Sequence, residues 1–485
     1  KIPNTIDDTK KAVDGSDIYL TIDFDIQYIA ENAVKEFQDT YKTEWAIFTV
    51  MDADTGAIVA SATSPNFNPN DTNTITSYMN PLVSYQYEPG SVMKIFSFAS
   101  AIEEGLYDGN ELYESGSIQV DSETIINDVD KTWGTISFDT GFAYSSNVAA
   151  TMLAFRLLEN GEKKLPDYYD ALGFGKKTGI ELANEVSGDM EVVYKSELAN
   201  SSFGQGISVT PIQMLQALSS MTNDGNIIKP YIVDKIVDSE GNVTYEGKRT
   251  VVNNVYSSQT VDKMHELMHK MIYEGLSTAW QIEGLSMIGK TGTAQIASPN
   301  GGYLTGEYDT IRSFAGIFPE EDPEYIVYVA ARKVEGNSVK FANVVTDAIE
   351  EIAKHAKLTS ETKETDLSKV INIENYLSKD INSVTTMLEN RKLNIIVIGN
   401  GKYVINQYPL KNSIVLENGK LFLITNGIEI KIPNMTGWSL SDVKNYCNLI
   451  GLNLEYSGYG YVVSQSIAQD TVLDIANMTL NVHLE

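Results

Sequence analysis

A polar stretch at residues 357–366, KLTSETKETD, divides this chain of 485 residues and limits how much of it can fold as one unit. Such a composition between apolar segments is typical of a linker. Residues 16–356 before it mix strand-like runs, such as IYLTID and YIVYVAARKV, with helical stretches. Because strands and helices do not alternate regularly, the pattern indicates an α+β or α/β domain. Residues 1–15 are expected to be the remnant of an N-terminal region.

A weak internal repeat of about 60 residues follows the linker. IVIGNGKYVINQ echoes LEYSGYGYVVSQ, and each copy has the pattern of one helix followed by strands. The matching residues lie 59 positions apart: Val384 and Val443, Leu393 and Leu452, Gly399 and Gly458, Gly401 and Gly460, Val404 and Val463. The repeat predicts two small modules, at residues 367–427 and 428–485.

The charge of the chain excludes some classes of partner. Lys+Arg number 36 and Asp+Glu 65, so the formal net charge is −29, which argues against binding to nucleic acid or docking on anionic lipid. One cysteine allows neither an internal disulfide framework nor a cysteine-based metal cluster. The sequence contains no run of 18 apolar residues and starts at Lys1 without a methionine, so an excised soluble portion is expected.

The stretch EPGSVMK places Ser91 three residues before Lys94, directly behind the turn-forming pair Pro89-Gly90. The residues that follow are apolar at helical spacing and end at Gly105, so a largely buried helix is predicted from Ser91 onward. Residues i and i+3 are neighbours on a helix, so Lys94 can reach the Ser91 hydroxyl. The start of a helix also offers positive potential to an oxyanion. The same letters fit an ordinary helix cap.

A nucleophilic Ser91 needs a base, and a lysine serves only when it is neutral. With an ordinary pKa near 10.4, one lysine in ~2500 is neutral at pH 7, which corresponds to a cost of roughly 4–5 kcal/mol. A site that uses Lys94 therefore requires burial and a second cation to lower this pKa, together with hydrogen-bond donors for the oxyanion.

Two downstream segments supply such groups. YSSN places Ser145 and Asn147 at the start of an apolar helical run, where a hydroxyl could relay a proton and an amide could orient a peptide. GKTGTAQIA, in an alternating, strand-like context, supplies a cation, two hydroxyls for a carboxylate and a glycine that permits close backbone approach. These residues are Lys290, Thr291, Thr293 and Gly292.

Each motif has lookalikes elsewhere in the chain. They are Ser441-Asp442-Val443-Lys444, Ser64-Pro65-Asn66, Ser298-Pro299-Asn300 and Lys177-Thr178-Gly179. Only Ser91, Ser145 and Lys290 occur in the expected order with fitting contexts, namely a helix start, a loop beside a helix and a strand.

This ordered triple resembles the signature of penicillin-binding proteins and serine β-lactamases. The strings SPNFNPN, YEPGSVMK, YSSN, SSFGQGISVTPIQML and GKTGTAQIA resemble a class B penicillin-binding protein, and IPNMTGWSLSDVKNYC resembles a PASTA module. The likeness is to the PASTA-bearing cell-division type. It implies an α+β fold, with an antiparallel sheet flanked by helices, followed by two small α+β PASTA modules. The first copy departs from the pattern, with NIENYLSKD in place of NMTGWSLSD.

The resemblance implies a peptidoglycan D,D-transpeptidase that works through a serine acyl-enzyme. Ser91 would attack the penultimate D-Ala carbonyl of a stem peptide, and Lys94 would take the hydroxyl proton. Ser145 would help protonate the leaving amine, while Asn147 holds the substrate amide and Lys94. Lys290 would favour the neutral form of Lys94.

The remaining implied roles concern binding. Thr291 and Thr293, with Gly292 between them, would bind the substrate carboxylate, and the backbone N–H groups of Ser91 and Thr293 would form the oxyanion hole. β-Lactams would acylate Ser91. The implied partners are stem peptides, β-lactams and membrane proteins of the division complex, including a glycosyltransferase. A membrane anchor is expected upstream, with the catalytic domain on the extracellular face, and neither a cofactor nor a metal is expected.

A zinc metallopeptidase is one rival interpretation. His265-Glu266-Leu267-Met268-His269 fits H-E-x-x-H. The helix around it has an apolar stripe that leaves both histidines beside or off the stripe, which is typical of a surface-facing helix without metal. The stripe consists of Val261, Met264, Met268, Met271 and Ile272.

Two further alternatives keep the fold. A β-lactamase or a β-lactam sensor would use the same triple, and a lactamase would need a glutamate between the second and third motifs, where Glu181 and Glu197 occur. A non-catalytic wall-binding protein would rely on its PASTA modules, but the intact triple argues against it.

Overall fold

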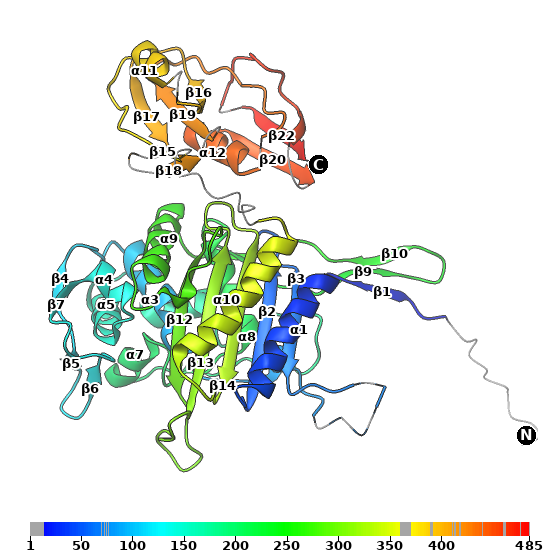
Figure 1. Ribbon diagram of the computed structural model, residues 1–485, viewed down its shortest axis with the longest axis vertical. Helices are drawn as coiled ribbons and strands as arrows, with labels where there is room; N and C mark the ends of the chain where they lie inside the picture. The colour runs from blue at the N-terminus through cyan, green and yellow to red at the C-terminus, as the bar shows by residue number, and fades with distance from the viewer. Residues whose placement is uncertain are drawn as a thin grey trace, which may run out of the picture. The chain divides into compact units, whose positions relative to one another are not determined.

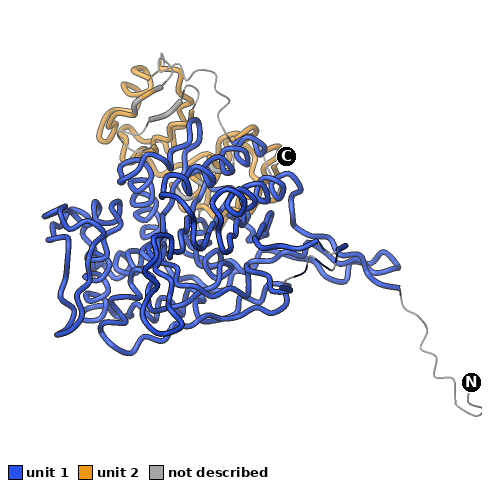
Figure 2. Tube along the Cα trace, turned by 60° about the horizontal axis from the view of Figure 1, so that its bottom comes forward, with its two compact units in different colours: residues 1–360 blue, residues 361–485 orange. Residues whose placement is uncertain are grey.

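The computed structural model describes residues 14–358 except 69, 72, 74 and 76, and residues 370–484 with gaps at 389–390, 410, 412–413, 417–418, 439, 459–461 and 476. The chain forms two compact units, residues 1–360 and 361–485, which Figure 2 colours separately. Each unit has apolar clusters of its own. The predicted linker at 357–366 lies mostly outside the described residues.

An antiparallel sheet of five strands forms the centre of the first unit (Figure 1). In order from edge to edge the strands are β12 Ile288–Gln295, β13 Thr310–Phe318, β14 Tyr325–Arg332, β2 Trp45–Asp52 and β3 Ile58–Ser64. Helices α1 (Phe24–Asp39) and α10 (Ser338–His355) lie side by side over one face, where the rings of Phe37 and Phe341 stack at 5.3 Å. The predicted α+β fold with an antiparallel sheet flanked by helices is confirmed.

Further helices pack against the sheet and against one another. Their bounds are α2 Pro81–Ser84, η2 Gly90–Met93, α3 Lys94–Glu103, α4 Phe138–Ala143, α5 Asn147–Asn160, α6 Leu165–Ala171, α7 Lys195–Ser201, α8 Pro211–Leu218, η3 Ser219–Met221, α9 Ser258–Tyr273 and η4 Thr278–Trp280. Among the described helices, none is long and apolar enough to cross a membrane.

The helix predicted from Ser91 begins with a tighter turn. Residues Gly90–Met93 form the 3₁₀ turn η2, in which the Lys94 N–H donates to the Ser91 carbonyl, and the α-helix α3 starts only at Lys94. A 3₁₀ turn at a helix start is common, because it satisfies backbone groups that the first α-turn leaves free. Gly105, with φ +67°, follows the end of α3 as predicted.

Small sheets complete the first unit. They are formed by β1 Asp17–Leu20 with β9 Val233–Val237 and β10 Val243–Glu246, by β4 Leu112–Glu114 with β7 Thr135–Ser137, by β5 Ser117–Gln119 with β6 Ile125–Asn127, and by β8 Asn226–Ile228 with β11 Val251–Asn254. The β5–β6 hairpin matters for the site, because α5 packs against β6.

The second unit contains the same arrangement twice. The first copy has α11 Ile381–Leu388, β16 Asn394–Ile398, β17 Val404–Tyr408 and β19 Lys420–Thr425, with the pair β15 Val370–Asn372 and β18 Ile414–Leu416 beside it. The second copy has α12 Leu440–Ile450, β20 Asn453–Gly458, β21 Val462–Gln465 and β22 Thr479–Leu484. In both copies the last strand lies in the middle, parallel to the first strand and antiparallel to the second.

The register of the repeat differs from the sequence-based prediction at one strand. Val404 and Val462 are the buried first residues of β17 and β21, whereas Val463 is 43% exposed. Gln407 and Gln465 occupy matching places, because each side-chain oxygen accepts a backbone N–H at 2.7 Å from the segment before the helix of its own copy. The offset is therefore 58 between β17 and β21, whereas β19 and β22 keep the offset of 59. A shift of one residue moves a strand side chain to the other face, so Val463 is not the counterpart of Val404.

Candidate active site

Ser91 lies in η2, where the chain passes close to the edge strand β12. Gly90 makes this approach possible, since its φ is +65° and a Cβ there would lie 2.8 Å from the carbonyl oxygen of Thr293. On β12, a Cβ at Gly292 would lie 3.0 Å from the carbonyl oxygen of Pro89. The two glycines therefore let the Ser91 turn pack directly against the strand.

Lys94 is fully buried and reaches back to Ser91 from the first turn of α3. Its Nζ donates to the Ser91 hydroxyl at 2.9 Å, to the Asn147 side-chain oxygen at 2.7 Å and to the Ser145 carbonyl at 2.6 Å. The Ser145 hydroxyl lies 3.2 Å from the same nitrogen. One amine thus connects the Ser91 turn with the loop before α5.

Lys290 approaches the same hydroxyl from β12. Its buried Nζ donates to the Ser145 Oγ at 3.0 Å and to the Thr291 carbonyl at 3.0 Å. Ser145 itself has φ +64°, a left-handed conformation that is uncommon for a residue other than glycine. The Ser145 hydroxyl therefore lies between two lysine amines, and the structure brings together all five residues that the sequence assigned to catalysis.

The surroundings of the two lysines shift their protonation. Burial, followed by the positive charge of Lys290, holds the pKa of Lys94 well below its ordinary value, and the Asp128 carboxylate acts in the opposite direction. Burial lowers the pKa of Lys290 to about 7. Lys94 therefore loses its proton far more easily than an exposed lysine, as a base for Ser91 must.

Sequence reasoning missed the residues that hold this loop. Asn147 donates from Nδ2 to the carbonyl of Asn127 at 2.9 Å, and the buried Asp128 accepts from the Ser146 hydroxyl at 2.9 Å. Asp128 lies in the acidic stretch VDSETIINDVD, where the letters alone do not separate it from Asp121 or Asp130. Only its burial distinguishes it.

Thr291, Gly292 and Thr293 continue along β12 from Lys290. Thr293 is exposed and Thr291 is half-buried, and both side chains lie on the sheet face opposite to that of Lys290 and Gly292. Within the described residues β12 pairs only with β13, so its outer edge offers backbone groups to an extended ligand. The predicted carboxylate binding by the threonines stays a prediction.

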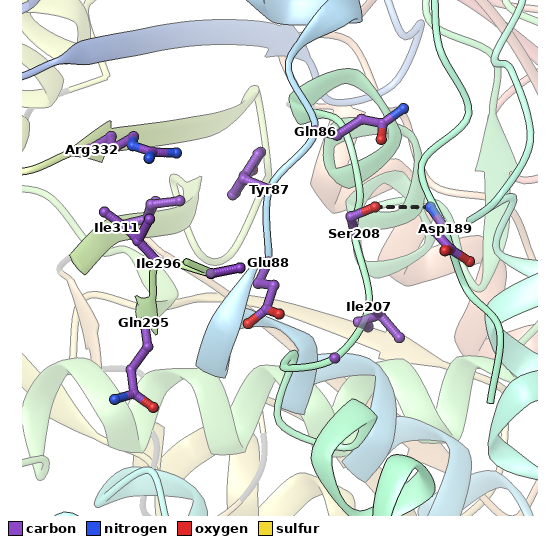
Figure 3. Close-up of a pocket in the computed structure, with 12 residues that line it drawn as sticks. Gln86, Tyr87, Glu88, Asp189, Ile207, Ser208, Gln295, Ile296, Ile311 and Arg332 are labelled. Carbon is purple, nitrogen blue, oxygen red and sulfur yellow. Dashed lines mark hydrogen bonds between the residues drawn. The ribbon is translucent and has the colours of Figure 1, made fainter. Parts of the chain in front are cut away.

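A cavity of about 350 Å³ adjoins this strand (Figure 3). It is lined by residues 86–88, 206–208 and 295–297 with Asp189, Ile311 and Arg332. Glu88, three residues before Ser91, accepts from Gln205 Nε2 at 3.0 Å, and burial raises the pKa of its carboxyl group. Figure 3 labels Glu88, Ile207 and Gln295 among the lining side chains, so the segment just before the Ser91 turn and the end of β12 border the same cavity.

The H-E-x-x-H residues each have a separate partner. His265 Nε2 lies 2.6 Å from the Met221 carbonyl, His269 Nδ1 lies 2.8 Å from a Glu320 oxygen, and Glu266 pairs with Lys263 at 2.9 Å. His265 is more enclosed than a surface-facing helix implied, and burial lowers its pKa. In the part of the chain that the structure describes, these residues belong to no group of three ligand side chains. This arrangement gives the metallopeptidase interpretation no support.

Comparison with known proteins identifies the family. The model described as "Penicillin binding protein transpeptidase domain" matches residues 46–350, and the PASTA domain model matches residues 430–485. Stage V sporulation protein D of Bacillus subtilis (strain 168) is 30% identical over 446 residues, which cover 87% of this chain and 67% of that protein. Because the transpeptidase match covers more than half of the chain, the chain belongs to the penicillin-binding protein transpeptidase family.

Solved structures give the same result. Penicillin-binding protein 2X from Streptococcus thermophilus matches with a TM-score of 0.65 and 29% identity, covering 98% of this chain and 73% of that chain. Penicillin-binding protein 3 from Mycobacterium tuberculosis, complexed with ampicillin, matches with a TM-score of 0.66 and 28% identity, covering 74% and 82%. The chain spans two thirds of the length of the B. subtilis relative and about half that of two mycobacterial PbpB relatives.

Proposed function

We propose that this chain cross-links peptidoglycan stem peptides as a D,D-transpeptidase, with Ser91 as the nucleophile and Lys94 as its base. The observation that carries the proposal is the buried Lys94 amine, which lies 2.9 Å from the Ser91 hydroxyl and has a pKa well below its ordinary value. Membership of the transpeptidase family supports the class of reaction.

In the first half-reaction, neutral Lys94 takes the hydroxyl proton while Ser91 Oγ attacks the carbonyl carbon of the penultimate D-Ala. The new C–O bond turns the carbonyl oxygen into an oxyanion, which the backbone N–H groups of Ser91 and Thr293 stabilise. The C–N bond then breaks, and terminal D-Ala leaves as an amine after receiving a proton through the Ser145 hydroxyl. The hydroxyl's contacts with both lysine amines, at 3.2 and 3.0 Å, suit this transfer.

Other residues bind the donor peptide. Asn147 contacts the substrate amide and keeps Lys94 in place through its side-chain oxygen, 2.7 Å away. The substrate carboxylate is bound by Thr291 and Thr293 on the open edge strand, and Lys290, the preceding residue of that strand, adds positive charge to the site. Its charge also keeps Lys94 deprotonated.

The second half-reaction releases the enzyme. An amine from a neighbouring stem peptide attacks the ester carbonyl, Lys94 takes the amine proton, and Ser91 Oγ leaves and recovers a hydrogen. β-Lactams mimic the D-Ala-D-Ala end and form the same ester with Ser91. The ampicillin complex of the mycobacterial relative supports β-lactam binding here.

The proposed setting is the outer face of the cell membrane during division. Residues 16–356 form the catalytic domain, residues 367–427 a first PASTA module and residues 428–485 a second. The longer protein carries a membrane anchor upstream and works beside a glycosyltransferase and other division proteins.

Labelling with a fluorescent penicillin, followed by peptide mapping, tests the function. We expect one adduct, on Ser91, and none in Ser91→Ala. Ser441→Ala is the matched control, because it removes the serine of the other Ser-x-x-Lys sequence and should leave labelling unchanged. An adduct on another residue, or undiminished labelling of Ser91→Ala, contradicts the proposal.

A further inference from the structure

A buried carboxylate lies directly behind the Ser145–Asn147 turn and has no role in the mechanism above. Asp128 follows strand β6 and is only 4% exposed. Its oxygens accept from the backbone N–H of Gly116 at 2.9 Å, from that of Val148 at 3.0 Å and from the Ser146 hydroxyl at 2.9 and 3.1 Å. A buried carboxylate is costly unless its hydrogen bonds are made, and these bonds tie it to the start of α5.

The turn that Asp128 contacts is strained. A non-glycine residue with φ +64°, as at Ser145, costs on the order of 1 kcal/mol and persists only when its surroundings hold it. The Asp128 carboxylate accepts from Ser146, which follows Ser145, and from Val148, which follows Asn147. The carbonyl of the neighbouring Asn127 accepts from the Asn147 side-chain amide at 2.9 Å. Residues 127 and 128 therefore fix both the Ser145 turn and the amide whose oxygen contacts Lys94.

Asp128 also acts through its charge. The charged groups that influence Lys94 are Lys290, from β12, and Asp128, at the end of β6. Tyr113, from β4, faces Ser146 and Asp128, and burial raises its pKa, so it stays neutral at physiological pH. The Asp128 carboxylate raises the pKa of Lys94 and thus opposes burial and Lys290.

We propose that Asp128 is a positioning residue of the active site, which holds the Ser145 turn in its left-handed conformation and supplies the negative charge that balances the two buried lysine amines. This inference rests on the proposed transpeptidase function and adds a residue to it.

The test measures the rate of acylation by benzylpenicillin against pH. In Asp128→Asn we expect a maximal rate at least about tenfold lower, because the amide nitrogen cannot accept a bond. The acid limb should move to lower pH by about 0.5–1 unit, because loss of the carboxylate lowers the pKa of Lys94 further. Ser146→Ala removes the hydroxyl that donates to Asp128 and accepts the Ala149 N–H at 3.0 Å, but it keeps the charge, so its rate should fall several-fold with an unchanged acid limb.

Asp130→Asn is the matched control. Asp130 lies two residues along the same segment but is exposed, and among the described residues its side chain accepts from the N–H and hydroxyl of Thr132, so both rate and acid limb should stay unchanged. An unchanged acid limb in Asp128→Asn overturns the charge role, and an unchanged maximal rate overturns the positioning role. Melting curves show which variants fold.

If Asp128→Asn does not fold, a second variant that removes the charge, Asp128→Ser, is measured in its place. If neither folds, Ser146→Ala decides, with rates measured well below its Tm because the variant also removes the N-cap of α5: a several-fold lower rate supports the positioning role, and a normal rate overturns the inference. The two proposals fail separately. Absence of wild-type acylation at Ser91 contradicts the function, whereas normal wild-type acylation with an unaffected Asp128→Asn contradicts only this inference.

Discussion

Single residues determine whether Ser91 can react, and Lys94 is the first of them. The Lys94 amine is buried 2.9 Å from the hydroxyl, and its pKa is depressed by burial and by Lys290. Lys94→Arg keeps a positive charge but removes the base, since a guanidinium stays protonated in a protein. We expect acylation by benzylpenicillin to fall by at least about 1,000-fold, as when other nucleophile-activating bases are removed. A rate within tenfold of wild type means that Lys94 is not the base.

The charge on Lys290 predicts the pH dependence. The base must be neutral, so the acylation rate should rise with pH through the apparent pKa of the coupled lysines, which lies below that of a free lysine. Lys290→Met removes a nearby positive charge, so the pKa of Lys94 rises and the acid limb moves to higher pH. This shift is opposite in sign to that expected for Asp128→Asn. Rate profiles from pH 5 to 10 compare the two, and a shift to lower pH in Lys290→Met contradicts the assignment.

Two glutamates allow a test against the β-lactamase alternative. Glu181 accepts from the Ile232 N–H at 3.0 Å and the Tyr245 hydroxyl at 2.8 Å. Glu197 accepts the N–H groups of Tyr194 and Val193, which lower its pKa. Both carboxylates already accept hydrogen bonds from neighbouring protein groups, so neither is expected to activate a water molecule over an ester.

The penicilloyl-enzyme should therefore persist for many minutes. Mass spectrometry after removal of free penicillin follows its decay, and Glu181→Gln and Glu197→Gln should decay at the wild-type rate. Turnover of about one per second, lost in either variant, would make this protein a β-lactamase.

At the residue scale the sequence predicted the ordered triple, because Ser91, Ser145 and Lys290 have distinctive neighbours. It could not predict the left-handed Ser145 or the role of Asp128. Both depend on contacts between segments that are distant along the chain, and the start of α5 meets the end of β6 only in the folded protein.

Among the elements, η2 and β12 must approach within contact distance for Ser91 and Lys290 to belong to one site. Alanine at Gly90 would combine a positive φ with a Cβ 2.8 Å from the Thr293 carbonyl oxygen. Gly105 has nearly the same φ, +67°, but nothing lies within 4 Å of a Cβ added there. Gly105→Ala therefore measures the cost of the left-handed backbone conformation without a steric clash. We expect Gly105→Ala to cost about 1 kcal/mol and Gly90→Ala about 2–3 kcal/mol of unfolding free energy, with slower acylation in Gly90→Ala alone.

Thermal melting and acylation rates measure both glycine variants. Equal losses of stability, or normal acylation in Gly90→Ala, would mean that the close approach of η2 to β12 is not needed. The sequence predicted a helix after Ser91 and a strand around Lys290, because apolar periodicity reports them directly. It missed the 3₁₀ entry and the offset of 58, since a tightened turn and a one-residue change in a loop leave that periodicity almost unchanged.

At the scale of the whole molecule, the chain consists of two units with separate cores. The apolar cluster of the first unit runs from Ile26 to Ala353, with Leu358 packed against it, and the clusters of the second unit involve only residues after 370. The sequence predicted this division from the polar stretch at 357–366, because the composition of a linker can be recognised without knowledge of the fold. The net charge of −29 likewise argues against nucleic acid and anionic lipid as partners without any knowledge of the fold.

Truncation after residue 360 tests the independence of the catalytic unit. All the residues of the Ser91, Lys94, Ser145, Asn147 and Lys290 site lie in the first unit, and Leu358 is retained, so no described member of its core is lost. We expect the shortened chain to melt within a few degrees of the corresponding transition of the full chain and to be acylated by benzylpenicillin at the same rate. Residues 361–485 expressed alone should show a cooperative transition of their own, because their apolar clusters are complete without the first unit. Aggregation of residues 1–360, or loss of their acylation while the full chain reacts, would mean that the second unit stabilises the enzyme itself.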